Sequence, residues 1–175
     1  MIKTYDNIVP FVEMQRIYNY VIQSYFRLGW EDRDDIKVPN IHSPYTELEV
    51  KDCGLYPYLE KIASKHNYEN NNFIECIVNL SKSGDYNFCH THKDKIVLLY
   101  YVNLHWQDGF GGETLFYDDD LINAKSVSSF VPGRIIIFDG DTPHTIRAQS
   151  TYGPDYRFTI SYFLEKELEN DRQNI

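Results

Sequence analysis

The chain has 175 residues, of which 42% are hydrophobic and 15% aromatic. This composition excludes an intrinsically disordered protein, and the length suits one ordinary domain. The formal net charge of −9 argues against nucleic acid as a partner, because an acidic surface repels phosphate backbones. No apolar run approaches the roughly 20 residues that cross a bilayer, so we expect no membrane-spanning segment.

The cysteines indicate a reducing compartment. Cys53, Cys76 and Cys89 show no CxxC spacing and are odd in number, which does not suit a disulfide framework. Residues 1–11 lack the basic flank and apolar stretch of a secretion signal. We therefore expect a cytoplasmic protein, either a monomer or a homodimer.

The first 70 residues are predicted to be helical support with a lid loop. Apolar side chains recur at helical spacing over residues 11–28, and Gly29 ends the pattern. Residues 31–47 are polar and contain prolines, which is typical of a long loop or lid. A second helix is predicted over residues 55–65, with Pro57 tolerated in its first turn.

From residue 72 onward the pattern changes to short strands. These segments are rich in β-branched and aromatic residues and are separated by Gly, Asp, Asn and Pro turns. The predicted strands are 73–80, 87–92, 96–103, 113–117, 127–130, 134–139, 144–148 and 158–164. Together they predict a mostly β fold, a double-stranded β-helix or jelly roll with the helices packed on one sheet. We expect a single domain over residues 1–175, with its core in 71–165 and a frayed tail in 166–175.

Three histidines form a candidate metal site. His90 and His92 are two residues apart, so on a strand their side chains would share one face. His144 follows Pro143 at the start of a later strand and could supply a third ligand. A facial set of this kind leaves coordination positions open, which suits a redox-active iron. The His-x-His spacing is a weak signal by itself, because two solvated strand histidines would look the same.

A series of short motifs surrounds these histidines. In chain order they are His90-Thr91-His92, Leu98-Leu99-Tyr100-Tyr101-Val102-Asn103 followed by Trp106, Gly111-Gly112-Glu113-Thr114-Leu115-Phe116, Pro132-Gly133-Arg134, Pro143-His144 and Arg157-Phe158-Thr159-Ile160. In order and spacing, residues 86–163 resemble the core of the 2-oxoglutarate and iron(II)-dependent oxygenases, in particular the prolyl-hydroxylase-like branch. Phage and marine-bacterial members are the most similar in style.

The resemblance implies a reaction and a set of roles. The reaction would use Fe(II), 2-oxoglutarate and O₂ to hydroxylate an unknown substrate, with release of succinate and CO₂. Candidate substrates are a prolyl or other peptidyl side chain and a free amino acid or small metabolite. His144 matches the distal metal ligand, and Arg157 matches the basic residue that anchors the far carboxylate of 2-oxoglutarate. The remaining residues implied in the cosubstrate pocket are Tyr101, Thr114, Leu99 and Ile146.

One departure from the family pattern concerns the third ligand. His92 falls where the family has a carboxylate, so either the site uses His90, His92 and His144, or His92-Lys93-Asp94 is the true His-x-Asp. An imidazole in place of a carboxylate leaves one more positive charge on the metal centre, which changes metal preference. Two other readings stay open: a three-histidine cupin-type dioxygenase or isomerase without 2-oxoglutarate, and a non-enzymatic binding jelly roll. Arg147 and His42 are further candidates with no assigned role.

Overall fold

The computed structural model describes residues 1–31, 33, 35, 36, 38–85 and 87–166. Three helices and ten strands occur within these residues. In chain order they are β1 (Ile2–Tyr5), α1 (Phe11–Val21), β2 (Arg27–Trp30), β3 (Asn40–Tyr45), α2 (Glu47–Cys53), α3 (Tyr56–Lys65), β4 (Phe73–Ser81), β5 (Lys95–Tyr101), β6 (Thr114–Tyr117), β7 (Ala124–Ser128), β8 (Ile135–Asp139), β9 (His144–Ile146) and β10 (Arg157–Glu165).

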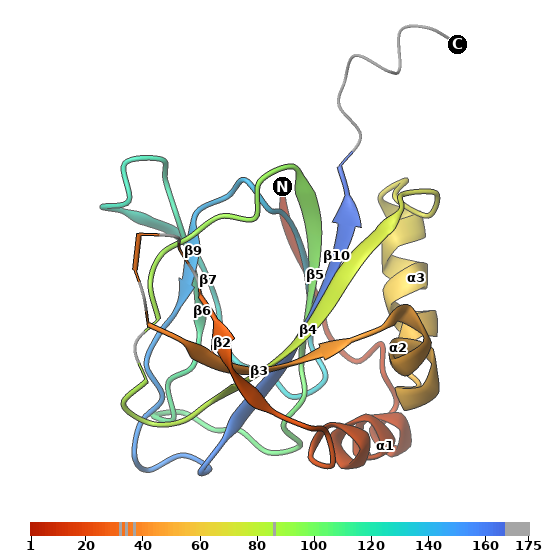
Figure 1. Ribbon diagram of the computed structural model, residues 1–175, viewed down its shortest axis with the longest axis horizontal. Coiled ribbons are helices and arrows are strands. Elements are labelled where there is room, and N and C mark those ends of the chain that lie inside the picture. The colour runs from red at the N-terminus through yellow and green to blue at the C-terminus, as the bar shows by residue number, and fades with distance from the viewer. Residues whose placement is uncertain (32, 34, 37, 86, 167–175) are drawn as a thin grey trace, which may run out of the picture.

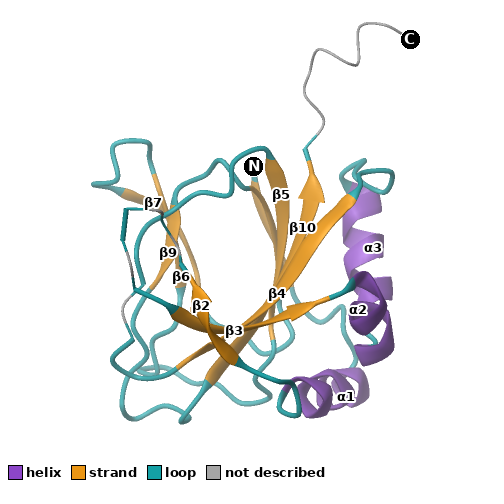
Figure 2. Cartoon of the chain, in the orientation of Figure 1, coloured by secondary structure: helices purple, strands orange, loops and turns teal. Residues whose placement is uncertain are grey.

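The strands form two antiparallel sheets. The large sheet has the order β1-β8-β5-β10-β4-β3-β2, and the small sheet has the order β7-β6-β9. The helices cover one side of the large sheet, while the small sheet lies on its other side (Figure 1). The same layers are visible when the chain is coloured by secondary structure (Figure 2). The prediction of a mostly β jelly roll with helices on one sheet is confirmed.

The central strands of the large sheet are buried on both faces, which explains their nearly continuous apolar sequence. Because neighbouring side chains alternate between faces, each strand contributes to two cores. On β5, Ile96, Leu98 and Tyr100 join the core beneath the helices, whereas Val97, Leu99 and Tyr101 join the core between the two sheets.

On β10 the same alternation directs one set of side chains to the core under the helices and the other set to the space between the sheets. Phe158, Ile160, Tyr162 and Leu164 belong to the core under the helices. The intervening residues face the space between the sheets, where Phe163 joins the second core and Thr159 and Ser161 line a cavity. Arg157 shares the parity of these residues, and it is also buried.

The first predicted helix is shorter than expected. α1 ends at Val21 rather than at residue 28, and the chain then enters β2. The helix-like spacing continues past the true end because Tyr18, on the helix, and Phe26, beyond it, both pack against Phe158, at 6.3 and 5.8 Å between ring centroids. Two separate segments therefore pack on the Phe158 ring, and together their apolar residues have the spacing of a single amphipathic helix.

The prediction of a loop over residues 31–47 is wrong for its second half. Residues 40–45 form β3, which pairs with β4 and β2 and buries His42 and Ser43. Pro44 is tolerated because the pairing with β2 runs only from Asn40 to His42, so no partner on that side needs its missing N–H. Residues 32, 34 and 37 of this predicted lid lie outside the described part of the chain.

Two further strand predictions need correction. Residues 87–92 form no strand; they contain only an isolated antiparallel bridge from His90 to His144. β1 was not predicted, although it pairs with β8 along Ile2–Tyr5. None of the helices in the described ranges is long and apolar enough to cross a bilayer.

Candidate metal centre and cosubstrate pocket

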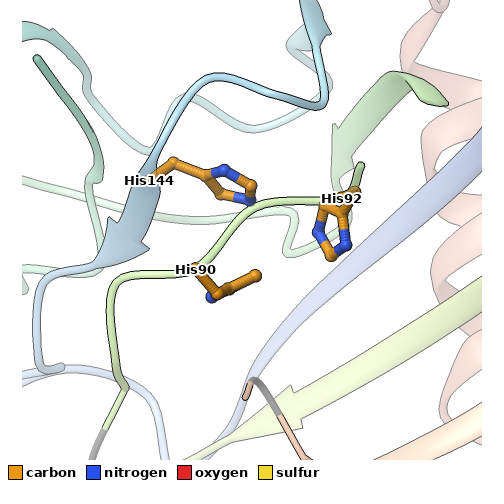
Figure 3. Close-up of side chains that lie close together, drawn as sticks. All are labelled: His90, His92 and His144. Carbon is orange, nitrogen blue, oxygen red and sulfur yellow. The ribbon is translucent and has the colours of Figure 1, made fainter. Parts of the chain in front are cut away.

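Three imidazoles converge between the two sheets. His144 begins β9, while His90 and His92 lie on the loop that leads into β5, and the three rings face a common space (Figure 3). One ring nitrogen from each lies within 4.8 Å of the others. Nitrogens bound to one ion at about 2 Å lie at most about 4 Å apart, so a small inward movement of the rings would place all three on one metal ion.

Backbone hydrogen bonds fix the positions of the three residues. The N–H groups of His90 and His144 each donate to the other residue's carbonyl, both at 3.0 Å. The N–H of His92 donates to the carbonyl of Gly140 at 2.7 Å. The expected strand is therefore replaced by an irregular segment that is bonded to His144, the first residue of β9, and to Gly140 in the turn before it.

The ring orientations leave the metal-binding nitrogens available. Nδ1 of His90 donates to the Phe88 carbonyl and Nδ1 of His144 donates to the Thr142 carbonyl, each at 2.9 Å. Because a carbonyl only accepts, these bonds place the proton on Nδ1 and leave the lone pair on Nε2. Such a second bond is the usual way in which a protein orients a metal-binding histidine.

Burial keeps two of the imidazoles neutral. The ring of His92 packs edge-on against Phe163 at 4.7 Å between centroids. Desolvation, followed by the neighbouring His144 and His90, lowers the pKa of His92 to about 2. Desolvation and His90 lower the pKa of His144 to about 3. A neutral imidazole is the form that binds a metal.

The alternative third ligand, Asp94, lies outside this group. Its side chain is exposed and its backbone is in the left-handed region, with φ of +57°. Its N–H donates to Oδ1 of Asp141 at 3.2 Å. Among the described residues, the geometry therefore brings together three nitrogen donors and no carboxylate. Imidazole ligands suit iron, copper, nickel and zinc.

A cavity of about 60 Å³ adjoins the three histidines, which is room for about four water molecules. Three residues predicted in the cosubstrate pocket, Leu99, Thr114 and Ile146, line it. The rest of its described lining consists of the three histidines and Asn40, Ile41, Ile77, Asn79, Leu80, Ser81, Asn87, Val97, Phe138, Thr159, Ser161 and Phe163. Apart from the histidines, these side chains carry no ionisable group.

Arg157 and Tyr101 lie just behind this lining. The hydroxyl of Tyr101 is 2.7 Å from Oγ1 of Thr114, which faces the cavity. The guanidinium carbon of Arg157 lies 5.6 Å from the centroid of the Tyr101 ring and 5.1 Å from that of Phe130. Arg157 is therefore connected to the pocket through residues that pack against it.

Arg157 is under-satisfied as a hydrogen-bond donor. It is 1% exposed, and its Nε donates to the Gly112 carbonyl at 3.1 Å. Its Nη2 is buried without a partner among the described residues, and so is Oγ1 of Thr159, which lines the cavity. Desolvation lowers the pKa of Arg157 to about 10. An anionic carboxylate would supply the missing acceptor and offset the cost of burying this cation.

The Gly-Gly pair explains how this arginine fits. Gly112 has φ of +79°, and a Cβ there would lie 3.0 Å from the Trp106 ring and 3.1 Å from Cδ and Nε of Arg157. At Gly111, with φ of +71°, a Cβ would lie 2.5 Å from the Ala148 carbonyl oxygen. Both positions need glycine for backbone conformation and for close approach.

The other sequence candidates are placed elsewhere. His42 is buried on β3, where desolvation lowers its pKa, and it is not part of the three-histidine group. Arg147 is exposed and pairs with Glu113 at 3.4 Å. Sequence reasoning missed Thr159 and the asparagines of the lining. The alternation along β10 could have indicated Thr159, since it lies two residues after Arg157 on the same face.

Comparison with known proteins supports the fold. No protein-family model matches the chain, and no curated protein matches it by sequence. Among solved structures, a prolyl-4-hydroxylase from Pseudomonas putida is 15% identical, with a TM-score of 0.65 over 95% of this chain and 92% of that one. A 2OG-Fe(II) oxygenase-family oxidoreductase from Burkholderia pseudomallei is 10% identical, with a TM-score of 0.69 over 95% and 85%.

A third structure was solved with a peptide. It is a prolyl hydroxylase from Trichoplax adhaerens in complex with a hypoxia inducible factor oxygen degradation domain peptide fragment. It is 18% identical, with a TM-score of 0.63 over 98% of this chain and 86% of that one. At these identities the likeness concerns the fold, and function must be argued from the site. The predicted resemblance is confirmed at that level: the chain has the fold of prolyl-hydroxylase-like 2-oxoglutarate oxygenases.

Proposed function

We propose that this protein is an Fe(II)- and 2-oxoglutarate-dependent oxygenase that hydroxylates an uncharged group of its substrate. One observation carries the proposal: three histidine nitrogens within 4.8 Å of one another adjoin a cavity, and a buried arginine with an unsatisfied N–H lies behind that cavity's lining. The first feature suits a metal and the second suits an anion. Together they match the two charged components that such an oxygenase must hold.

In this proposal each component has its own set of side chains. His90, His92 and His144 hold the metal through ring nitrogens, two of them fixed by their Nδ1 hydrogen bonds. When bound, Fe(II) and 2-oxoglutarate would supply the oxidising chemistry with O₂. Arg157 and Thr159 hold the far carboxylate of 2-oxoglutarate, because both have buried polar atoms without partners among the described residues.

The other pocket residues orient the cosubstrate and exclude water. Tyr101 orients Thr114 through the 2.7 Å contact of their hydroxyls. Leu99 and Ile146 give the cavity apolar walls. A dry, low-dielectric pocket strengthens the interaction between a guanidinium and a carboxylate.

The part of the cavity lining that is not assigned to the cosubstrate favours a neutral substrate group. Outside the three histidines its described side chains are apolar, hydroxyl or amide groups. A free amino acid would bring a carboxylate and an ammonium that need charged partners. Amides such as Asn79 and Asn87 offer both donors and acceptors, which suits the backbone of a peptide. We therefore propose a peptidyl side chain, with proline as the first to test, in line with the peptide complex of the Trichoplax enzyme.

An anaerobic titration tests the proposal. Metal-free protein is titrated with Fe(II) and 2-oxoglutarate while the visible iron-to-keto charge-transfer band is followed. We expect the band only with both components present, and expect it to disappear in His144→Ala and in Arg157→Ala. Arg147→Ala is the matched control, because Arg147 is an exposed arginine outside the cavity lining, and this variant should keep the band.

The same titration separates the second candidate function. The all-histidine donor set also suits a three-histidine dioxygenase that works without 2-oxoglutarate. That reading predicts iron binding without a charge-transfer band, and no effect of Arg157→Ala on any ligand. A protein that binds no iron at all would contradict both enzymatic proposals and leave the binding jelly roll.

A further inference from the structure

An ion cluster of three side chains, Lys166, Asp139 and Asp141, lies beside the loops that carry the histidines. Nζ of Lys166 donates to both carboxylate oxygens of Asp139, at 2.9 and 2.8 Å, and to Oδ2 of Asp141 at 2.7 Å. The N–H of Lys166 donates to the carbonyl of Asp94 at 3.1 Å, and the N–H of Asp94 donates to Oδ1 of Asp141. One lysine at the end of β10 therefore joins two other segments of the chain.

Both of those segments lead directly to proposed metal ligands. The turn over residues 139–142 accepts the N–H of His92 at the Gly140 carbonyl, and the N–H of Gly140 donates back to Lys95 at 2.8 Å. The same turn holds Thr142, whose N–H donates to the Asp139 carbonyl and whose carbonyl accepts Nδ1–H of His144. The backbone of one ligand and the ring of another thus depend on the turn that Lys166 binds.

The two loops approach each other too closely to tolerate a change of position. A Cβ on Gly140 would lie 2.3 Å from the His92 carbonyl oxygen and 2.7 Å from that of Lys95. The contact is therefore between backbone atoms, and no side chain can adjust if the turn moves. A displacement of the turn would be passed directly to His92.

The charges of the cluster make it more than a single surface ion pair. Its side chains are partly shielded: Lys166 is 30% exposed and Asp139 is 29% exposed. Burial opposes the charge on Lys166, but its hydrogen bonds to the two aspartates raise its pKa above the ordinary value. The hydrogen bond from Lys166 lowers the pKa of Asp141. Without the lysine, two neighbouring carboxylates would repel each other across the turn.

We propose that Lys166 is a positioning residue, which holds the 92–94 loop and the 139–142 turn in the arrangement that binds the metal. The inference rests on the proposed three-histidine centre. It goes beyond that centre by assigning metal affinity to a residue outside the cavity lining and outside the ligand set. Asp139 and Asp141 are the groups through which Lys166 acts.

The sign of the expected effect separates positioning from electrostatics. Removal of a nearby positive charge would by itself strengthen the binding of a cation. If Lys166→Met weakens metal binding, the loss therefore comes from the altered loops and not from the altered charge. The test uses Co(II), whose d–d absorption reports both affinity and coordination. We expect Lys166→Met to raise the Co(II) dissociation constant at least tenfold and to change the band shape.

Two further variants complete the design. Lys166→Arg keeps the charge and the donors, and should retain most of the affinity. Lys51→Met is the matched control, because Lys51 forms a comparable 2.9 Å pair with Glu47 on α2, away from the histidines. We expect it to bind Co(II) like the wild-type protein.

Amide hydrogen exchange of the metal-free proteins makes the test independent of the metal. Lys166→Met should speed exchange at the N–H groups of His92 and Gly140, which bond the two loops, and leave α1 and β5 unchanged. Unchanged exchange and affinity in Lys166→Met would overturn the inference. The inference would also be overturned if exchange rose uniformly over the protein and if Lys166→Met and Lys166→Arg lost Co(II) affinity equally. That result would indicate a general structural role for Lys166. If wild-type protein binds no metal, the proposed function fails, while the exchange at His92 and Gly140 still decides whether Lys166 positions the loops.

Discussion

His90 and His144, which come from distant parts of the sequence, are joined by a reciprocal pair of backbone hydrogen bonds of 3.0 Å each. The bonds involve main-chain atoms only, so the spacing of the two residues does not depend on their imidazoles. Replacement of one ring should remove a ligand while the backbone around it stays in place. Metal binding can therefore be tested by side-chain substitutions with little disturbance of the fold.

The first prediction concerns the identity of the third ligand. We expect His92→Ala to weaken Co(II) binding by at least about 10–100-fold, a loss that even outer-shell changes can cause at metal sites. His92→Asp should keep binding, because it restores the carboxylate found in the family motif. Asp94→Asn should have no effect, since Asp94 is exposed and outside the group. Co(II) absorption titrations measure all three.

The opposite pattern would identify Asp94 as the ligand. If Asp94→Asn lost the metal and His92→Ala retained it, the loop would rearrange on metal binding and the three-histidine reading would be wrong.

The β core was predictable because its signals are local. In β5 and β8 almost every side chain is apolar, and both faces are buried, so burial and β propensity agree. The candidate site was indicated by the order of its motifs, since His144 and Arg157 follow their expected neighbours along the chain. The structure groups His144 with His90 and His92 and buries Arg157 behind the adjoining cavity, while the roles implied for these residues stay predictions.

The missed elements depend on partners that are distant in the sequence. β3 is polar and contains Pro44, and it becomes a strand because β4 supplies its hydrogen bonds. The loop carrying His90 is likewise fixed by His144 and Gly140 rather than by its own residues. By contrast, α2 has a local signal in the sequence: Thr46 and Glu49 form a capping box, and the Thr-x-x-Glu spacing is typical of one.

The second prediction is that replacing Arg157 stabilises the metal-free protein and abolishes the binding of 2-oxoglutarate. The side chain is 1% exposed and has an unsatisfied Nη2, so the metal-free protein carries the cost of a buried, poorly paired cation. We expect Arg157→Met to raise the free energy of unfolding by about 1 kcal/mol, as replacement of buried charges by apolar groups often does. Urea denaturation measures this gain.

The same variant should lose the response to 2-oxoglutarate. Wild-type protein with metal should be stabilised by added 2-oxoglutarate, because a ligand that binds the folded state shifts unfolding. Arg157→Met should show no such shift. A variant that is less stable than wild type, yet still stabilised by 2-oxoglutarate, would show that Arg157 is structural and that another group anchors the cosubstrate.

The third prediction is a pH dependence at the Asp6–Arg134 pair. Nε and Nη2 of Arg134 donate to the two oxygens of Asp6 at 2.7 and 2.8 Å. The hydrogen bond from Arg134 lowers the pKa of Asp6. A carboxyl whose pKa is lower in the folded state stabilises the fold above its unfolded pKa, near 3.9. That contribution is lost as the pH falls through the lower, folded value.

The pair can be isolated with Asp6→Asn. Because Asp6 is 40% exposed, we expect the wild type to be more stable by only about 0.5–1 kcal/mol at pH 7. The difference should shrink as the pH is lowered below 4 and disappear once Asp6 is protonated. Thermal or urea unfolding of both proteins across this range provides the measurement. An equal difference at pH 7 and pH 2.5 would mean that the effect does not come from the ionised carboxylate.

The fourth prediction compares two glycines that are needed for different reasons. At Gly140 a Cβ would lie 2.3 Å from a backbone oxygen, whereas at Gly84 nothing lies within 4 Å but φ is +87°. We expect Gly84→Ala to cost about 1 kcal/mol of unfolding free energy, from backbone strain alone. Gly140→Ala should cost about 2–3 kcal/mol, because overpacking forces the backbone to shift.

The two variants should also differ at the metal centre. The atoms that a new methyl group at Gly140 would displace belong to His92 and Lys95, so Gly140→Ala should weaken Co(II) binding as well as stability. Gly84→Ala should lose stability and keep its affinity for Co(II). If both variants lost stability and metal in the same proportion, metal affinity would simply follow global stability. The close contact of the turn with His92 would then have no separate role in holding the ligand in place.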